Sequence, residues 1–199
     1  DQYNSILEIF KDYSSDGIKK IFVNGSAGTG KTILAIYLIK LLSTLSQYEL
    51  HDLDIEDEAL LFELNAFKKN NPEKLTIGLV VPMTSLRNTL KQVFKSVHGL
   101  SSNMVIGPTD VVKKNYDFLI VDEAHKIDNG NRGILLQRKI EDVIEKNPNV
   151  RIFFSSPFTS NPELLLKGLD LDTSKDSINT EFVAVNQNLL YVTQVLRKP

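Results

Sequence analysis

Cysteine and tryptophan are both absent from the 199 residues of this chain. Without cysteine, disulfides and thiolate metal sites are excluded, and a reducing compartment is the natural setting. The chain has no run of 18 apolar residues and no visible secretory signal, so we expect a cytoplasmic protein with no membrane partner. The net charge is only −2, so nucleic-acid binding would have to come from a local basic patch.

The composition is that of a folded domain, with 42% hydrophobic and 24% charged residues. A chain of this length can bury a proper core, and we predict a single domain over residues 1–199. The first residue is Asp1 rather than methionine, which favours a fragment of a longer protein.

Short apolar runs alternate with amphipathic segments along the chain. The predicted strands are residues 20–24, 75–81, 104–106, 117–121, 150–154, 181–185 and 189–193. The predicted helices are residues 2–12, 31–45, 56–69, 84–97 and 134–145, and Thr109 is expected to cap a further short helix. This alternation predicts an α/β fold of three layers, with helices on both faces of a parallel sheet. Residues 46–74 are interpreted as an insertion carrying its own helix, which ends at Asn-Asn-Pro.

The strongest motif is Gly-Ser-Ala-Gly-Thr-Gly-Lys-Thr at residues 25–32, a complete phosphate loop between a predicted strand and a predicted helix. Its glycines can turn backbone amides inward, and the helix N-terminus adds partial positive charge. Lys31 can reach the β- and γ-phosphates of ATP, and the Thr32 hydroxyl can bind Mg²⁺. The predicted nucleotide-binding residues of the loop are Gly25, Ser26, Ala27, Gly28, Thr29, Gly30, Lys31 and Thr32. A glycine-rich turn before a helix is the alternative, but it gives Lys-Thr no packing purpose.

A second motif follows the apolar strand at residues 117–121, where Asp122 and Glu123 stand in the Walker B arrangement. Asp122 is predicted to hold Mg²⁺ together with Thr32, and Glu123 to orient or deprotonate the attacking water. His125 is a candidate link between the γ-phosphate and a neighbouring loop. A helix start that favours acidic residues is the alternative, which the upstream P-loop makes less attractive. The glutamate favours a hydrolytic ATPase over a simple switch.

With these motifs, and with Val-Val-Pro-Met-Thr-Ser-Leu-Arg after residue 79, the chain resembles the first motor domain of superfamily 1 helicases. More narrowly, it is similar to the Schlafen group-3-like DNA/RNA helicase domain, from Gln2 to Arg197, and best over residues 80–97 and 105–127. The resemblance implies a RecA-like P-loop fold and ATP and Mg²⁺ as cofactors. It also implies single-stranded DNA or RNA as partner and a second motor domain elsewhere in the parent chain.

The resemblance also assigns residues outside the two motifs. Gln2 would read the adenine edge, and Gln194 and Arg197 would belong to motif IV, whose arginine approaches the γ-phosphate. The predicted catalytic residues are therefore Glu123, Lys31 and Arg197. The predicted nucleic-acid contacts are Pro82, Thr84, Ser85, Arg87, Lys91 and Thr109. For Gln2 and Arg197, surface polar residues without a special role remain the alternative.

Basic residues support the nucleic-acid contacts only in part. Arg87, Lys91 and Lys95 lie four residues apart and share one helix face, where phosphates would bind without sequence preference. A solvated basic helix face explains the same spacing. Thr84 and Ser85 can donate to a phosphate or simply cap the helix.

The chain departs from the helicase pattern after the strand at 150–154. Motif III usually carries Asp and then Gln there, whereas this sequence has Ser-Ser-Pro-Phe-Thr from Ser155. Hydroxyls can still bond phosphate or water, but the coupling of ATP to movement is in question. A nucleotide-sensing regulatory or scaffold module without motor activity is therefore the alternative function, and an ATPase acting on a protein polymer is a third.

Overall fold

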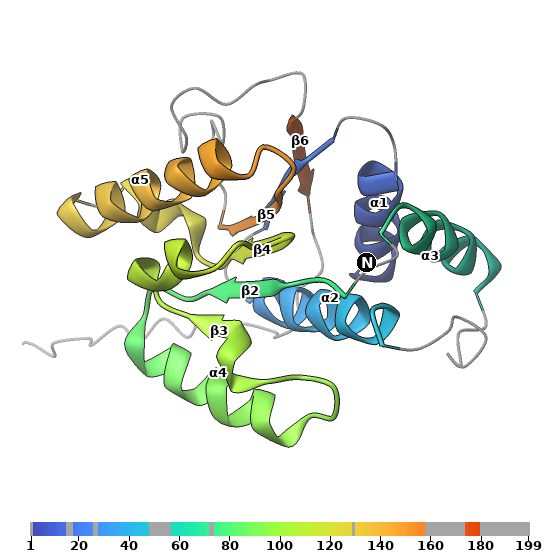
Figure 1. Cartoon of the computed structure of the whole chain (residues 1–199), viewed down its shortest axis with the longest axis horizontal. Coiled ribbons are helices and arrows are strands. Elements are labelled where there is room, and N and C mark those ends of the chain that lie inside the picture. The colour runs from blue at the N-terminus through green and yellow to red at the C-terminus, as the bar shows by residue number, and fades with distance from the viewer. Residues whose placement is uncertain are drawn as a thin grey trace, which may run out of the picture.

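Six parallel strands form the centre of the molecule, in the order β3-β2-β4-β5-β1-β6 (Figure 1). This computed structural model describes residues 2–14, 18–25, 28–47, 57–71, 74–128, 130–157 and 174–179. The strands are β1 Lys20–Asn24, β2 Ile77–Val80, β3 Val105–Ile106, β4 Phe118–Val121, β5 Arg151–Ser156 and β6 Ser174–Asn179. All their pairings are parallel, so their carboxyl ends meet at one edge of the sheet.

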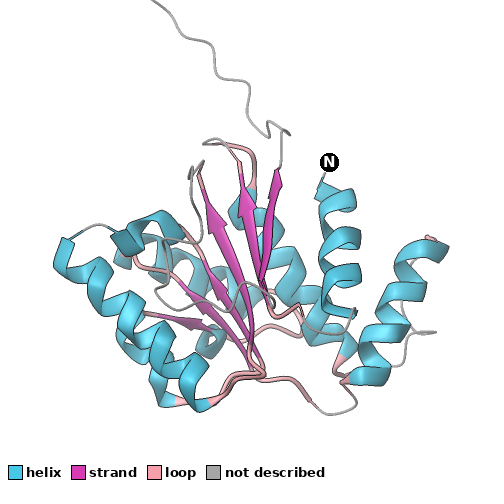
Figure 2. Ribbon diagram, turned by 90° about the horizontal axis from the view of Figure 1, so that it is seen from above, coloured by secondary structure: helices cyan, strands magenta, loops and turns pink. Residues whose placement is uncertain are grey.

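Helices cover both faces of this sheet (Figures 1 and 2). The α-helices are α1 Gln2–Ser14, α2 Lys31–Leu45, α3 Glu58–Asn70, α4 Thr84–Ser96 and α5 Gly130–Lys146. Short 3-10 helices are η2 Ser102–Met104, η3 Pro108–Lys113 and η4 Ala124–Asp128. The three-layer α/β fold predicted from the alternation of strands and helices is confirmed.

Alternating side chains of the strands build two separate cores. In β4, Phe118 and Ile120 join the core formed with α1 to α4, whereas Leu119 and Val121 join the core formed with η3, η4 and α5. Because both faces are covered, every residue of β4 is buried, which is why parallel strands appear as unbroken apolar runs.

Helix α3, which the sequence placed in an insertion, packs directly against α1. Asp57 caps its start by accepting a hydrogen bond from the Leu60 amide at 2.8 Å. The rings of Phe10 and Phe67 meet edge to face with centroids 5.2 Å apart. Leu60, Leu64 and Phe67 of this helix therefore contribute to the same core as α2.

Two expectations about local elements differ from the structure. Gly107, not Thr109, is the N-cap of η3; Pro108 takes the first helical position, since its fixed φ suits that place, and Thr109 lies inside the helix. Strand β6 has no counterpart among the predicted strands, because its sequence Ser-Lys-Asp-Ser-Ile-Asn carries a single apolar residue. The predicted strands at 181–185 and 189–193 lie outside the described residues.

In the described part of the chain, no helix is both long and apolar enough to cross a bilayer.

Candidate functional site

The phosphate loop joins β1 to α2 at the carboxyl edge of the sheet. Gly28 and Gly30 both have left-handed backbone angles, with φ of 84° and 80°, which side chains other than glycine rarely adopt. Gly30 is the N-cap of α2 and has no side chain to fill the space over the first helical amides. The helix therefore presents free N–H groups and the positive end of its dipole to an anion, as phosphate binding requires.

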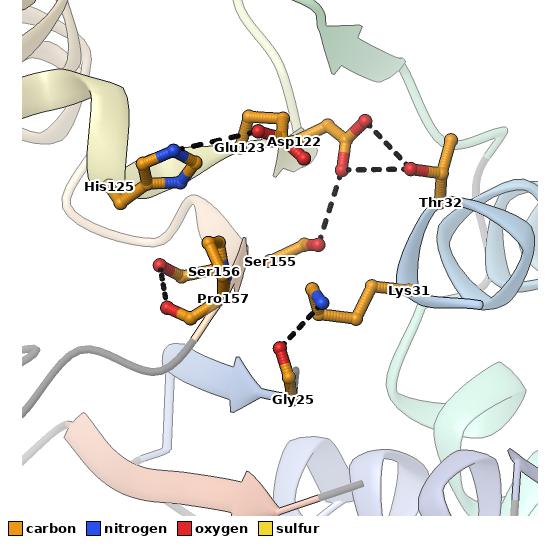
Figure 3. A network of polar contacts seen from close by, with 9 residues as sticks. All are labelled: Gly25, Lys31, Thr32, Asp122, Glu123, His125, Ser155, Ser156 and Pro157. Carbon is orange, nitrogen blue, oxygen red and sulfur yellow. Dashed lines mark hydrogen bonds and ion pairs between the residues drawn. The ribbon is translucent and has the colours of Figure 1, made fainter. Parts of the chain in front are cut away.

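Lys31 lies over this loop with 9% of its surface exposed. Its Nζ donates to the Gly25 carbonyl at 2.6 Å (Figure 3). It also donates to the Thr29 hydroxyl at 3.3 Å. Burial lowers the pKa of the Lys31 ammonium, and the nearby carboxylates of Glu123 and Asp122 oppose this shift. A largely buried cation at this position is well placed to bind phosphate oxygens.

Asp122 follows β4 and meets the P-loop helix from the other side of the site. The Thr32 hydroxyl donates to its carboxylate at 3.1 Å (Oδ2) and 3.4 Å (Oδ1), although the two residues are 90 positions apart. Asp122 is almost completely buried, with 1% of its surface exposed. Burial raises the pKa of its carboxyl, and the hydrogen bonds from Thr32 and Ser155 act in the opposite direction.

Ser155 provides the third contact of this cluster. Its Oγ donates to Asp122 Oδ1 at 3.2 Å, and its side chain is fully buried (Figure 3). The contact arises because β5 lies between β1 and β4, so its carboxyl end is next to the end of β4, where Asp122 follows. Next to it, the Gly25 amide donates to the Ser156 carbonyl at 3.2 Å and ties the start of the P-loop to β5.

The sequence predicted phosphate or water as the hydrogen-bond partner of the hydroxyls that follow the strand at 150–154. It did not predict that the Ser155 hydroxyl bonds to the Asp122 carboxylate. The available signal was that Ser155 directly follows the predicted buried strand at 150–154. The neighbour of that strand could not be read from spacing alone.

Glu123 has a left-handed backbone with φ of 57°, and no other non-glycine residue in the described ranges has a positive φ. This conformation costs about 1–3 kcal/mol and persists where the surrounding structure enforces it, often at functional sites. The Glu123 carboxylate lies 3.6 Å from His125 Nε2, and both side chains are about one-third exposed, at 32% and 27%. Glu123 thus reaches solvent beside the buried Asp122.

A second hollow lies at the carboxyl ends of β2 and β3. It has a volume of about 730 Å³ and is lined by Pro82, Met83, Thr84, Arg87, Gly107, Pro108, Thr109, Asp110, Leu135 and Leu136. Four of the predicted nucleic-acid contacts, Pro82, Thr84, Arg87 and Thr109, come together here. Ser85 is exposed on the first turn of α4, and Lys91 lies part-buried further along that helix.

Arg87 is held by contacts within the protein. Its Nη1 donates to the Val81 carbonyl at 2.8 Å and its Nη2 to the Thr84 hydroxyl at 3.1 Å. A Cβ on Gly107 would come within 3.3 Å of the guanidinium carbon, so the group also packs against that residue. Arg87 therefore braces the loop after β2 as well as lining the hollow.

The capping alternative for the start of α4 is wrong, because the N-cap is Met83 and Thr84 instead accepts from Arg87.

One family model matches most of the chain. The model described as "Type III restriction enzyme, res subunit" (ResIII) matches residues 1–159. The chain belongs to the ResIII family. It is accordingly a helicase-type P-loop domain that binds nucleotide, from a family of ATPases that interact with nucleic acid. Lys31, Thr32 and Asp122 lie together at the carboxyl edge of the sheet of this ResIII domain.

Among solved structures, the match to this ResIII domain is more distant. A structure titled "Structure of AMPPCP-bound DnaA from Aquifex aeolicus" is 17% identical, with a TM-score of 0.37. The alignment covers 90% of this chain and 45% of that DnaA chain, so the domain spans less than half of its length. No curated protein matches the chain.

The ResIII domain also offers a partial shell for a metal ion. Within the described ranges, no group of three or more His, Cys, Asp or Glu side chains is placed to hold a metal. The Thr32 hydroxyl and the Asp122 carboxylate do touch, and Mg²⁺ commonly takes one or two protein ligands and completes its shell with phosphate and water. These residues therefore fit a nucleotide-bound Mg²⁺.

Several predicted site residues lie beyond what the structure describes. Gln2 begins α1, but its side chain is not described, and Ser26, Ala27, Gln194 and Arg197 lie outside the described residues.

Proposed function

We propose that this domain binds ATP with Mg²⁺, hydrolyses it, and couples the nucleotide state to single-stranded DNA or RNA. The observation that carries the proposal is the contact of Thr32 with Asp122, at 3.1 Å across 90 residues. It joins two motifs for phosphate and metal at the carboxyl edge of the sheet, where ligands of open parallel sheets bind. The buried ammonium of Lys31 lies in the same site, next to the carbonyl of Gly25, which directly follows β1.

Catalysis in this proposal is mainly placement and charge compensation. The amides of Gly28 and Gly30 and the Lys31 ammonium receive phosphate oxygens, and Lys31 exchanges its contact with the Gly25 carbonyl for them. Thr32 and Asp122 hold Mg²⁺, which when bound neutralises charge that develops on the phosphate oxygens. Ser155 keeps the Asp122 carboxylate in its orientation through the 3.2 Å hydrogen bond.

Glu123 is the proposed acceptor of the proton from the attacking water. The water oxygen forms a bond to the γ-phosphorus as the bond to the ADP oxygen breaks, which leaves ADP and phosphate. His125, 3.6 Å from the Glu123 carboxylate, would orient that group. The left-handed backbone of Glu123 sets it apart from the buried Asp122, so one carboxylate serves the metal and the other faces water.

Gln2 is proposed to read the adenine edge. Gln194 and Arg197 are proposed to form motif IV, in which the arginine approaches the γ-phosphate. A second motor domain of the parent chain would supply an arginine finger, worth on the order of 10³–10⁵ in rate in related enzymes. The 199-residue chain should therefore bind ATP but hydrolyse it slowly. A turnover equal to that of the full-length parent would contradict this part of the proposal.

The hollow beside α4 is the proposed nucleic-acid site. In the hollow, Thr84 and Thr109 offer donors for phosphates, and Arg87 presents its guanidinium while it holds the loop after β2. Ser85 and Lys91 offer further donors on α4, outside the lining of the hollow. Met83 is 45% exposed and Leu135 40% exposed, so the same hollow has apolar surface for a base. This mixture of donors and apolar surface suits a flexible single strand better than a closed duplex. Within the helicase-type proteins, we place the domain in the Schlafen group-3-like group, in the cytoplasm.

A second candidate is a nucleotide-sensing regulatory module without motor activity. The observation that favours it is the Ser155 hydrogen bond to Asp122. This hydroxyl, at the position where a motor would carry a residue for the γ-phosphate, is already engaged by the protein. Such a module would bind ATP and thereby change its affinity for a partner. A DNA or RNA strand would not stimulate its ATP hydrolysis.

ATP hydrolysis by the full-length parent, with and without single-stranded DNA and RNA, separates the two candidates. Lys31→Ala provides the blank. Stimulation that disappears in this blank supports the motor and identifies its strand, whereas ATP binding without stimulated turnover supports the module. Lys91→Glu should abolish stimulation without changing basal turnover. Lys11→Glu, an exposed lysine on α1, is the matched control and should change neither.

A further inference from the structure

A polar cavity, separate from the hollow beside α4, lies at the opposite edge of the sheet from the nucleotide site. Its volume is about 540 Å³, and it is lined by Tyr13, Ser14, Ile18, Lys19, Asn70, Asn71, Asp117, Asn147, Asn149 and Arg151. Arg151 is the first residue of β5, while Lys19 and Asp117 immediately precede β1 and β4. The cavity is therefore at the amino ends of the same strands whose carboxyl ends hold the P-loop, Ser155 and Asp122, and it is not an extension of that site.

Arg151 is a part-buried guanidinium, and its contacts with the described residues occupy few of its donors. Its Nη1 donates to Asn71 Oδ1 at 2.7 Å, and its guanidinium lies 5.3 Å from the centre of the Phe67 ring. Within the described part of the chain, no carboxylate forms an ion pair with it. The Asp117 carboxylate accepts from the Thr76 amide at 2.8 Å and acts on Arg151 only from a distance. A guanidinium has five N–H donors in a planar fork, so the fork is available to a planar or tetrahedral oxyanion.

Lys19 adds a second cation to the same cavity. Its Nζ donates to the Pro148 carbonyl at 3.1 Å and to Asn149 Oδ1 at 3.0 Å, and both of these acceptors are neutral. Two cations thus face one carboxylate, and the asparagine amides around them offer further donors and acceptors. The carboxyl ends of α1, α3 and α5 bring partial negative charge to the cavity, which limits how much anionic charge it can accept.

We propose that this cavity binds a small molecule that carries one oxyanion group, a carboxylate or a phosphate monoester, on a polar body. Arg151 takes the oxyanion with its fork, Lys19 adds charge, and the asparagines hydrogen-bond the rest of the molecule. A volume of about 540 Å³ lies within the range of about 300–1,000 Å³ typical of small-molecule sites. The partial negative charge of the helix ends disfavours a polyphosphate, so this is a different specificity from that of the P-loop.

The test is a titration of the ¹⁵N-labelled chain with inorganic phosphate and, separately, with acetate, followed by backbone amide shifts in NMR. The Lys31→Ala background weakens phosphate binding at the P-loop, and the residue-by-residue readout separates the two sites. We expect saturable shifts at Asn71, Asn149 and Arg151. A response to phosphate alone identifies a phosphate monoester as the ligand class, and a response to acetate identifies a carboxylate.

Arg151→Gln should weaken this binding about tenfold to a hundredfold, because a charge-assisted hydrogen bond is lost. Arg138→Gln, an exposed arginine of α5, is the control and should bind as the parent does. If Arg151→Gln does not fold, Lys19→Gln gives a second variant at the same site, and its affinity should also fall. Shifts confined to the P-loop glycines, or equal affinity in the Lys19 or Arg151 variants, would overturn the proposal.

Discussion

Ser155 and Asp122 are joined by a 3.2 Å hydrogen bond between the carboxyl ends of two neighbouring strands. The bond links the P-loop side of the site to the metal side, because the residue after Ser155 also accepts from the Gly25 amide. One strand therefore fixes the relative position of both nucleotide motifs. This role does not require the acidic residue and glutamine expected at this place from the resemblance to superfamily 1 helicases.

Replacing Ser155 should weaken the metal site without destroying it. Ser155→Ala removes a donor to the buried Asp122, and the loss of such supporting hydrogen bonds typically lowers metal affinity or activity by about 10–100-fold. The measurement is the Mg²⁺ concentration that half-saturates ATP binding. Ser155→Thr keeps the hydroxyl and should restore most of the affinity.

Ser156→Ala is the matched control for this prediction. The Ser156 hydroxyl donates to the Pro157 carbonyl and not to Asp122, so its loss should leave the Mg²⁺ dependence unchanged. Equal effects of the two alanine variants would show that Ser155 acts only through general stability.

Asp122→Asn should stabilise the nucleotide-free protein near neutral pH while it abolishes the Mg²⁺-dependent function. Burial raises the pKa of Asp122, so as the pH rises above about 4 the unfolded chain ionises before the folded protein and the wild type loses stability. The asparagine variant lacks this loss, and its advantage should grow with pH until the folded pKa is passed. We expect about 0.5–2 kcal/mol at pH 7 by urea denaturation.

Asp110→Asn provides the opposite sign in the same experiment. The hydrogen bond from Lys113, with 2.6 Å between the charged atoms, lowers the pKa of Asp110. Its contribution is therefore present above the ordinary pKa and disappears as the pH falls through the folded pKa. The variant should be less stable than the wild type at neutral pH and equal to it in acid. Parallel pH profiles for the two variants would contradict both assignments.

Glu123→Gln should separate nucleotide binding from hydrolysis. The amide keeps the size of the side chain but cannot accept a proton, and general-base catalysis contributes about 10²–10⁴ in rate. We expect ATP affinity within a factor of about two and turnover in the full-length parent reduced by about that range. A variant that loses ATP binding would instead assign Glu123 to the binding of Mg²⁺–ATP.

Gly78→Ala should destabilise the fold by about 1–3 kcal/mol, because the added methyl group overpacks a core. A Cβ at this position in β2 would lie 2.8 Å from Tyr116 Cε1 and 3.1 Å from Leu119 Cδ1. The measurement is the free energy of unfolding in urea.

Gly107→Ala is the comparison for that change, since its Cβ would be 3.3 Å from the end of the Arg87 side chain, which can move. Its cost should be smaller and should disappear in the Arg87→Ala background. An equal loss of stability in both variants would contradict the assignment of the Gly78→Ala cost to its close contact with Tyr116.

Local sequence determined much of this protein. The apolar runs specified the buried strands, because a covered strand needs apolar residues on both faces, and Phe118 to Val121 meet this need. The glycines before Lys31 specified a left-handed turn into a helix, since only glycine adopts that backbone at little cost. These are effects between near neighbours in the chain, so length and spacing were enough to predict them.

The tertiary structure decided the remainder, because it chose which strands are neighbours. Placing β5 between β1 and β4 brought Ser155 to Asp122, and pairing with β1 made a strand of the polar segment Ser174–Asn179. The tertiary structure also packs Arg87 against Gly107 and bonds it to the Val81 carbonyl, so that this basic residue stabilises the loop after β2. The cavity around Arg151 exists only because three strands begin at one edge. Contacts between residues tens of positions apart depend on topology, which no local pattern in the sequence carries.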